Sequence, residues 1–257
     1  MGNTNMAKRT AVVTGAASPR GIGVAAARQF AAAGWAVVLV DRDLQGANAA
    51  AADINRTAGV QALAVPCDVT NEASVQQAAQ RVRQEADLPT VGALANIAGV
   101  PEPATFSELS LEKWNRVLAV NLTGTFLMCK AFVPQMMAQR YGRIVNMSSI
   151  TAFTGGGIFS KSAYAAAKAG IVGFTRGLAR DLAPYAITAN AVAPGVVDTD
   201  IRMGTTDEIE HSLSGAVPLG RQASAAEIAA LFVWLCSENA GYITGTTQHI
   251  NGGSYFG

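Results

Sequence analysis

Residues 14–23 read TGAASPRGIG, between the apolar run Ala11–Val13 and the helical pattern VAAARQFAAAG at residues 24–34. A strand, a glycine-rich turn and a helix in this order are typical of a phosphate-binding loop. Glycine lets the backbone approach the phosphate closely, and the helix points its free N–H groups at the negative charge. Gly15, Gly21 and Gly23 have the positions for these roles. A tight turn without a ligand has the same local pattern, so this stretch needs support from elsewhere in the chain.

A carboxylate follows at the end of the next apolar run. Asp41 lies eighteen residues after Gly23, close to the roughly twenty residues at which an acidic side chain hydrogen-bonds the adenosine ribose of a dinucleotide. The glycine-rich turn and this carboxylate together predict a dinucleotide-binding site.

Short β-branched runs alternate with helical patterns along the whole chain. These runs are Thr10–Thr14, Ala36–Val40, Gln61–Val65, Val91–Asn96, Arg143–Met147, Ile187–Val192 and Gln248–Ile250. Such alternation predicts a doubly wound α/β fold, with a parallel sheet of about seven strands and helices on both faces. No linker divides the chain, so residues 1–257 are expected to form one domain. Residues 199–217 lack a strand pattern and are expected to form a loop or short helices over the substrate pocket.

Composition excludes several classes of protein. Half of the 257 residues are hydrophobic and 14% are charged, as in globular proteins. The net charge of +1, without a Lys/Arg-rich run, argues against nucleic-acid binding. Charged and polar residues interrupt the apolar stretches and no signal peptide is visible, so a cytoplasmic protein that does not span a membrane is expected. Three distant cysteines and two histidines predict neither a disulfide framework nor a metal site.

A tyrosine and a lysine lie four residues apart on a helical pattern, downstream of a serine that ends a strand. The residues are Ser149, Tyr164 and Lys168. A lysine ammonium favours the phenolate and so lowers the pKa of a nearby tyrosine, whose ordinary value is about 10. The pair is therefore suited to exchange a proton with an alcohol or ketone oxygen while a nicotinamide exchanges hydride. Ser148 competes with Ser149, since adjacent residues at a strand end point in opposite directions.

Over nearly its whole length the sequence resembles the short-chain dehydrogenase/reductase family, which implies a Rossmann-like fold. The resemblance rests on TGAASPRGIG, Asp41, Cys67-Asp68-Val69, Asn96-Ile97-Ala98-Gly99, Asn121, Ser149, Tyr164, Lys168 and Pro194–Thr199. It implies that Tyr164 is the acid/base, that Ser149 binds the reacting oxygen, and that Lys168 holds the nicotinamide ribose. It also implies that Asn121 bends its helix and holds a water that relays protons to Lys168.

The resemblance further implies a set of cofactor-binding residues and a subunit arrangement. Asp68 and Val69 would flank the adenine, Asn96 would stabilise the sheet, and Val197 and Thr199 would meet the nicotinamide carboxamide. The expected set is Gly15, Arg20, Gly21, Ile22, Gly23, Asp41, Arg42, Asp68, Val69, Asn96, Ala98, Gly99, Tyr164, Lys168, Pro194, Gly195, Val197 and Thr199. Members of the family form tetramers, here through the helices around 111–140 and 162–183, so a homotetramer is expected.

The sequence departs from the family pattern in three places. Five residues separate Gly15 from Gly21, where the family has three, so Pro19-Arg20 is expected to bulge at the rim of the loop. Fifteen positions separate Ser149 from Tyr164, and the extra length holds three consecutive glycines at 155–157, which predicts a bulge beside the substrate. Ile97 replaces an asparagine of the family's Asn-Asn-Ala-Gly motif.

The expected cofactor is NAD rather than NADP. Asp41 can accept hydrogen bonds from both ribose hydroxyls of NAD and would repel the additional phosphate of NADP. Arg20 and Arg42 instead favour NADP. In NADP-dependent relatives, an arginine just before the second glycine, as in Arg20-Gly21, often reaches the additional phosphate.

The expected reaction interconverts a secondary alcohol and a ketone, with a polyol, sugar, hydroxy acid or small hydroxy-ketone as the substrate. Lys161 or Arg202 could bind an anionic substrate, although both could equally be solvated. An alternative enzyme is a reductase of 3-oxoacyl thioesters, which calls for a strong preference for NADPH and a basic patch to dock an acidic carrier protein. Arg140, Arg143 and Arg176 are candidates for such a patch. A third alternative is a non-catalytic protein that senses a dinucleotide.

Overall fold

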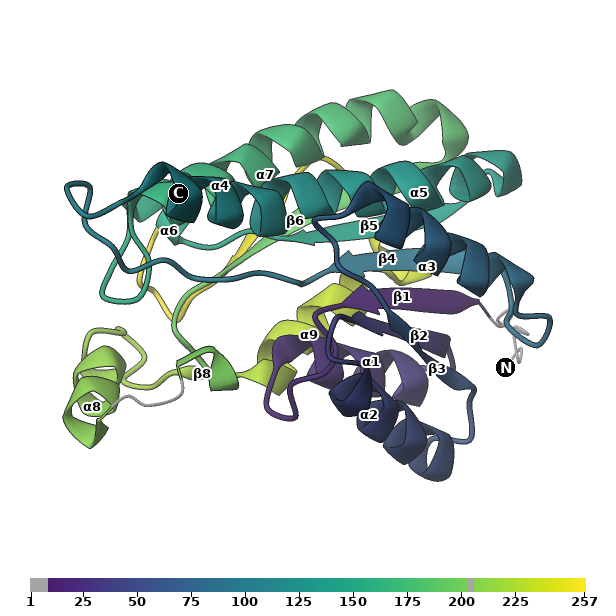
Figure 1. Cartoon of the computed structure of the whole chain (residues 1–257), viewed down its shortest axis with the longest axis horizontal. Coiled ribbons are helices and arrows are strands. Elements are labelled where there is room, and N and C mark those ends of the chain that lie inside the picture. Colours follow the sequence, from purple (N-terminus) through teal and green to yellow (C-terminus); the bar gives the residue numbers. More distant parts are fainter. Residues whose placement is uncertain (1–8, 203–205) are drawn as a thin grey trace.

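The computed structural model describes residues 9–202 and 206–257. Its centre is a parallel sheet of seven strands in the order β3-β2-β1-β4-β5-β6-β9, which confirms the expected doubly wound α/β fold (Figure 1). The strands are β1 (Thr10–Thr14), β2 (Ala36–Asp41), β3 (Ala62–Pro66), β4 (Val91–Asn96), β5 (Gly142–Met147), β6 (Ile187–Pro194) and β9 (Thr247–Ile250). Each lies on one of the β-branched runs in the sequence.

Helices cover both faces of the sheet, as parallel crossovers require. Helices α1, α2 and α9 lie on one face, while α3, α4, α5 and α7 lie on the other (Figure 1). Their bounds are α1 (Ile22–Ala32), α2 (Leu44–Thr57), α3 (Glu72–Gln84), α4 (Leu111–Leu118), α5 (Gly124–Gln139), α6 (Thr151–Thr154), α7 (Ser162–Leu182), α8 (Asp207–Gly215) and α9 (Ala225–Leu235). The small helix α6 and helix α8 lie beyond the sheet, near the ends of β5 and β6.

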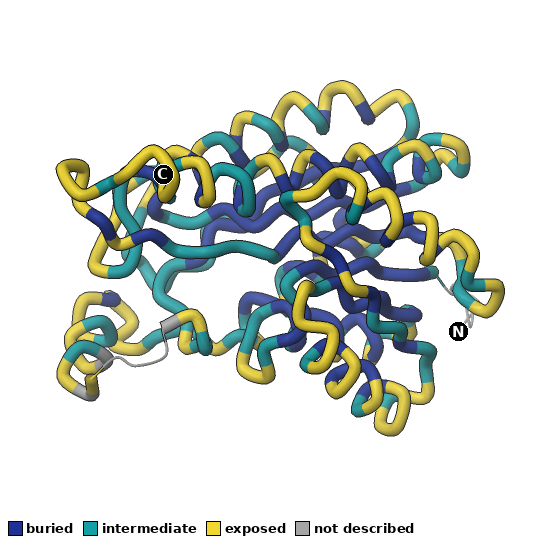
Figure 2. Tube along the Cα trace, viewed as in Figure 1, coloured by how far each residue is buried: buried dark blue, intermediate teal, exposed yellow. Residues whose placement is uncertain are grey.

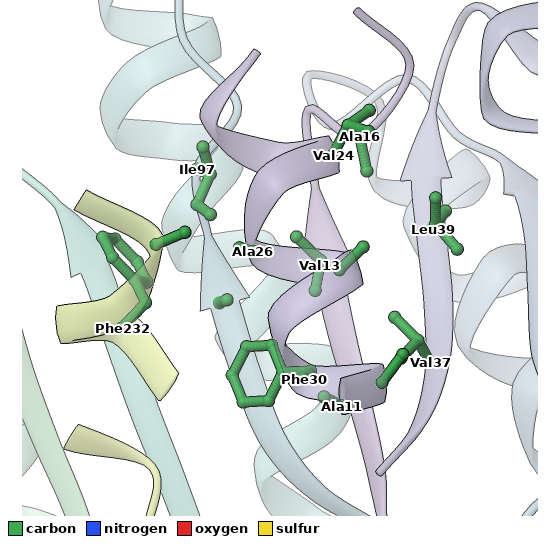
Figure 3. Close-up of a cluster of buried hydrophobic side chains, with 14 of the residues drawn as sticks. Ala11, Val13, Ala16, Val24, Ala26, Phe30, Val37, Leu39, Ile97 and Phe232 are labelled. Atoms are coloured by element: carbon green, nitrogen blue, oxygen red, sulfur yellow. The ribbon is translucent and has the colours of Figure 1, made fainter. Parts of the chain in front are cut away.

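The sheet is buried on both sides, so successive strand residues serve two different cores (Figure 2). Val13 of β1 faces the core under α1 and α9, and its neighbour Val12 faces the core under α3 and α5. In the first core, Phe30 of α1 and Phe232 of α9 are completely buried (Figure 3). This two-sided burial explains why the strand sequences are continuous apolar runs and do not alternate between apolar and polar residues.

The three cysteines fill space in these cores. Cys67, Cys129 and Cys236 are buried and unpaired, in agreement with their interpretation as small hydrophobic residues. Burial raises the pKa of the Cys129 and Cys236 thiols to about 12, so both stay protonated at neutral pH.

One long helical stretch changes its hydrogen-bonding pattern in the middle. Helix α4 continues into a π-helical turn at Ala119–Thr123 and then into α5. By length and composition the stretch Leu111–Gln139 could cross a membrane, but 56% of its most apolar window is buried within the protein. More than half of this apolar window therefore belongs to the core beneath it.

The order of the strands creates a crevice. The chain runs outward from β1 to β3 and then returns to place β4 on the other side of β1. Ligands of doubly wound sheets bind at such a switch point, beyond the carboxyl ends of the strands. Beyond β6, the short strands β7 (Val197–Asp198) and β8 (Ala223–Ser224) pair in parallel. Their pairing brings together the two ends of the segment that contains helix α8.

Candidate active site

Two adjoining cavities open beyond the carboxyl ends of the strands, with volumes of about 370 and 310 Å³, and Gly99 lines both. Of the expected site residues, the larger cavity is lined by Ile22, Gly99, Ser149, Tyr164, Lys168, Pro194, Gly195, Val197 and Thr199. The smaller is lined by Gly15, Asp41, Arg42, Asp68, Val69, Ala98 and Gly99. Residues from seven segments of the chain thus meet in one trench.

The glycine-rich turn has the geometry of a phosphate cradle. Gly15 has a φ of +68°, and a Cβ there would lie 2.9 Å from the Cα of Ala98. A Cβ on Gly23 would lie only 2.1 Å from the carbonyl oxygen of Gly15, so helix α1 begins against the end of β1. The N-terminus of α1 at Gly21 has no side-chain cap. Its amide groups are therefore left for a ligand, and the turn fits the diphosphate of a dinucleotide.

The two additional residues of the turn form an exposed bulge that is tied to the segment after β6. The hydroxyl of Ser18 donates to a carboxylate oxygen of Asp200 at 2.5 Å, and the backbone N–H of Arg20 donates to the same oxygen at 3.1 Å. The guanidinium of Arg20 pairs with Asp198. Arg20 therefore lines neither cavity and points toward this acidic pair instead of a cofactor phosphate.

Positive and negative side chains balance in the smaller cavity. The carboxylate of Asp41 accepts hydrogen bonds from the backbone N–H groups of Ala17 and Asp43, at 3.1 and 3.0 Å. Arg42, Arg116 and Asp68 line the same cavity, so two guanidinium groups stand against two carboxylates. Arg116 is a residue that sequence reasoning missed, since it lies on helix α4, 75 positions beyond Asp41 at the end of β2.

Burial controls the ionisation of the Tyr164–Lys168 pair. The ammonium nitrogen of Lys168 lies 5.4 Å from the ring centre of Tyr164, and it donates to the carbonyl oxygen of Met147 at 2.8 Å. Burial raises the pKa of Tyr164 to about 12, against an opposing hydrogen bond with Ser149, and it lowers the pKa of Lys168 to about 7. Any lowering of the Tyr164 pKa by Lys168 does not outweigh this burial, which penalises the charged forms of both groups.

The two adjacent serines have different surroundings. The Ser149 hydroxyl hydrogen-bonds with Tyr164, and it donates to the Thr151 hydroxyl at 3.1 Å. Ser148 is fully buried, and its hydroxyl donates to the carbonyl oxygen of Lys168 at 2.9 Å. Ser149 thus has the geometry to meet a reacting oxygen, while Ser148 anchors helix α7 to the end of β5.

Asn121 lies in the π-helical turn. Its amide nitrogen donates to the carbonyl oxygens of Val100 and Val117, both at 3.0 Å, and the Thr125 hydroxyl donates to the Asn121 carbonyl at 2.9 Å. Its side-chain oxygen is buried and has no hydrogen-bond partner among the residues that the structure describes. A Cβ on Gly99 would lie 2.7 Å from this oxygen and 3.5 Å from the Lys168 nitrogen. An unpaired buried acceptor so near a buried amine is typical of a functional site rather than of a helix kink alone.

Asn96 supports the sheet rather than the cavity. It is buried at the end of β4, where its amide nitrogen donates to the side-chain oxygen of Asn146 at 2.9 Å. Ile97, where the family has a polar residue, packs into the core beneath α1 and also reaches the larger cavity.

Residues of the glycine bulge and of the segment between β7 and β8 form one wall of the larger cavity. Sequence reasoning did not single out Thr151, Leu213, Ala216 and Val217, which line it together with Ile158 and Ser160. Leu213, Ala216 and Val217 lie within residues 199–217, the segment that was expected to cover the substrate pocket, and Thr151 lies two residues after Ser149.

Several other candidates lie elsewhere. Lys161 precedes α7 outside the cavity lining, and the side chain of Arg202 lies outside the described residues. For the expected basic patch, Arg143 is buried at the opposite end of β5, so it does not offer a docking surface with Arg140 and Arg176.

Comparison with known proteins agrees with this geometry. A family model described as "Enoyl-(Acyl carrier protein) reductase" matches residues 15–255. Over 96% of this chain and 97% of its own length, the 3-oxoacyl-[acyl-carrier-protein] reductase FabG of Aquifex aeolicus is 40% identical. The Escherichia coli FabG is 37% identical over 98% of this chain and 99% of its own. The chain belongs to the short-chain dehydrogenase/reductase family.

A solved structure supports the same assignment. The crystal structure of a 3-oxoacyl-[acyl-carrier protein] reductase from Brucella melitensis matches with a TM-score of 0.90 and 33% identity, covering 98% of this chain and 93% of that one. This short-chain dehydrogenase/reductase is therefore an oxidoreductase that acts on a CH–OH or keto group. The comparisons favour reduction of a 3-oxoacyl thioester over oxidation of a polyol or sugar.

The comparisons also contradict the expected cofactor. Reduction of 3-oxoacyl thioesters carries a preference for NADPH, so the expectation of NAD is wrong. That expectation rested on one carboxylate, Asp41. The structure shows why this carboxylate alone does not determine the cofactor. Both oxygens of Asp41 already accept hydrogen bonds from backbone N–H groups, and Arg42 and Arg116 line the same cavity and offset its negative charge.

Proposed function

We propose that this enzyme reduces the ketone of a 3-oxoacyl thioester to a secondary alcohol with NADPH, in the cytoplasm. The observation that carries the proposal is the hydroxyl pair of Tyr164 and Ser149 inside a largely apolar cavity that adjoins the dinucleotide trench. Such a cavity suits an acyl chain better than a polyol, because many hydroxyl groups would lose water there without finding partners. The names of the relatives support the same substrate class.

The residues assigned to the cofactor would hold it along the trench. The amide groups at the start of α1 would bind the diphosphate, Asp68 and Val69 would flank the adenine, and Arg42 would face the additional phosphate. Val197 and Thr199 line the cavity where the nicotinamide would lie. When bound, NADPH supplies the hydride that goes to the ketone carbon.

Tyr164 supplies the proton that goes to the ketone oxygen. Because the pKa of its phenol is about 12, Tyr164 is protonated at neutral pH and ready to act as the acid. Ser149 donates a hydrogen bond to the same oxygen as negative charge develops on it. The products are the 3-hydroxyacyl thioester, NADP⁺ and a phenolate.

Lys168 and Asn121 restore the proton. The ammonium of Lys168 stabilises the phenolate that forms beside it, and the unpaired side-chain oxygen of Asn121 would hold a water between Lys168 and solvent. Such a relay explains why both groups are buried so close together.

The first test follows NADPH oxidation with a short 3-oxoacyl thioester and, in parallel, with a 3-oxoacyl carrier protein. The Tyr164→Phe variant should lower kcat by about 10²- to 10⁴-fold, because it removes the proton donor and keeps the ring. Tyr242→Phe is the matched control, since Tyr242 is fully exposed, and its kcat should be unchanged. Turnover that is equal or faster with NADH, or that occurs only with polyols, would overturn the proposal.

The subunits are proposed to form a homotetramer through helices α5 and α7. Phe126 of α5 is 44% exposed, and its ring meets that of Phe174 on α7 edge to face at 6.2 Å. An aromatic pair of which one ring is exposed and the other partly buried, on two adjacent helices, is typical of a surface that another subunit covers.

A further inference from the structure

A row of three hydroxyl groups lies along the wall of the larger cavity. The Ser149 hydroxyl donates to that of Thr151 at 3.1 Å, and the oxygens of Thr151 and Ser160 are 3.3 Å apart. All three residues line the cavity. The proposed reaction uses only Ser149, so Thr151 and Ser160 have no part in the proton transfer.

The backbone fixes this row. The N–H of Thr151 donates to the Ser149 hydroxyl oxygen at 3.1 Å, and the Thr151 side chain is 7% exposed. Ser160 forms an isolated parallel bridge with Glu102, and its carbonyl accepts the N–H of Gly157 at 2.8 Å. Two hydroxyls, one from the start of helix α6 and one from the other side of the glycine bulge, are thus held beside Ser149.

The spacing of the row suits a substrate with two carbonyl groups. In a 3-oxoacyl thioester a single methylene separates the ketone from the thioester carbonyl. When both carbonyls face the same side, their oxygens lie about as far apart as two hydrogen-bonded hydroxyls. A hydroxyl donor at each oxygen would hold the ketone carbon in a fixed position for the hydride.

We propose that Thr151 and Ser160 bind the thioester carbonyl oxygen while Ser149 and Tyr164 bind the ketone oxygen. The two residues then determine specificity for 3-oxoacyl compounds and other 1,3-dicarbonyls over isolated ketones. A ketone without the second carbonyl leaves these part-buried hydroxyls without that partner, and such sites discriminate strongly against the incomplete substrate. The inference rests on the proposed function.

The test compares two substrates of equal chain length, a 3-oxoacyl thioester and a 2-alkanone, with NADPH as the reductant. Thr151→Val and Ser160→Ala should each lower kcat/KM for the thioester by about 10- to 100-fold. For the 2-alkanone, each should change kcat/KM by less than about threefold, because that ketone needs only Ser149 and Tyr164. The matched control is Thr57→Val on the distant helix α2, which should leave both values unchanged. Thermal melts of each variant confirm that it is folded.

The outcomes separate the two proposals. Equal losses on both substrates would mean that Thr151 only positions Ser149, and no loss on either would mean that the row does not bind substrate; both results overturn the inference alone. A wild-type enzyme that fails to reduce the thioester but reduces the 2-alkanone would instead overturn the proposed function, and the inference with it.

Discussion

At the residue scale, the chemistry of the site depends on two side chains that the fold removes from water. The sequence places Tyr164 and Lys168 one helical turn apart, and the position of helix α7 against β5 buries them. Burial favours the neutral form of each, which shifts their pKa values in opposite directions, to about 12 and about 7. An acid that is protonated and an amine that titrates near neutrality are suited to proton donation followed by reprotonation.

The lysine shift predicts a dependence of stability on pH. Between pH 7 and 10.5 the unfolded chain binds a proton at Lys168 that the folded chain does not, so folding becomes more favourable as pH rises through this window. Below pH 7 the folded protein carries the full cost of a buried charge. From pH 7 to 9.5, the free energy of unfolding of the wild type should rise by a few kcal/mol relative to that of Lys168→Met, since one pKa unit corresponds to about 1.4 kcal/mol.

Urea denaturation at several pH values, without cofactor, measures this difference. Lys130→Met is the control, because Lys130 lies at the surface beside Glu72 and its loss should give a curve parallel to that of the wild type. Parallel curves for Lys168→Met would show that burial does not lower the pKa of Lys168.

At the scale of elements, the trench depends on how closely helix α1 approaches strand β1. The turn between them leaves no space for a side chain at Gly23, so the first amide groups of the helix lie directly over the end of the strand. The two additional residues, Pro19 and Arg20, leave this contact intact. They bulge outward and are tied to Asp198 and Asp200, which lie close to them only in the folded protein.

Gly23→Ala should therefore disturb both folding and cofactor binding. The new Cβ would lie 2.1 Å from the carbonyl oxygen of Gly15, so the helix must shift away from the strand. We expect a loss of about 2–3 kcal/mol in the free energy of unfolding and at least a tenfold weaker affinity for NADPH. Thermal denaturation and fluorescence titration with NADPH measure the two effects.

Gly215→Ala provides the contrast for this substitution. Gly215 ends helix α8, and a Cβ there would meet no atom of the described residues within 4 Å, so the free energy of unfolding should change by less than about 0.5 kcal/mol. Equal behaviour of the two variants would contradict the close approach at Gly23.

At the scale of the whole molecule, the helical stretch Leu111–Gln139 is apolar on more sides than one subunit buries. One side packs on the sheet, while Phe126 and Leu111 remain exposed. The proposed tetramer would cover this surface, and it would explain the excess of apolar residues better than a membrane would, because the opposite side already belongs to the core.

Phe126→Glu should separate the proposed subunits along this surface. A buried carboxylate without a partner is costly at an interface, so association should weaken by at least tenfold. Light scattering coupled to size-exclusion chromatography gives the molar mass of each form. Leu44→Glu is the control, since Leu44 is 38% exposed on helix α2 and the mass should not change. A wild-type protein that elutes as a monomer would refute the tetramer.

Most of the fold could be predicted from the sequence because its elements are local. Each central strand is a short β-branched run that is buried on both faces, and each such run reads clearly along the chain. Because parallel strands end at one edge of the sheet, the residues that follow them had to meet. The family resemblance implied a common site for Gly15, Asp41, Gly99, Ser149 and Pro194, and the structure places all five along the cavities at that edge.

Three features of the site depend on contacts between distant segments. Arg20 pairs with Asp198, Arg116 balances Asp41, and Thr151 meets Ser160 across the glycine bulge. No periodicity or motif in the sequence encodes these distances. The mistaken expectation of NAD arose here, since one carboxylate was judged without the charges and backbone groups that surround it.

The sequence by itself determined the order of strands and helices along the chain and the position of the glycine-rich turn. It also determined which side chains could carry acid/base chemistry. Those properties follow from patterns within a few turns of chain. The tertiary structure alone decided which charges offset one another, which hydroxyls form a row, and how burial shifts the pKa values of Tyr164 and Lys168. The physical reason is that electrostatic energies and hydrogen bonds depend on distance and on the exclusion of water, and both are set only when remote segments pack.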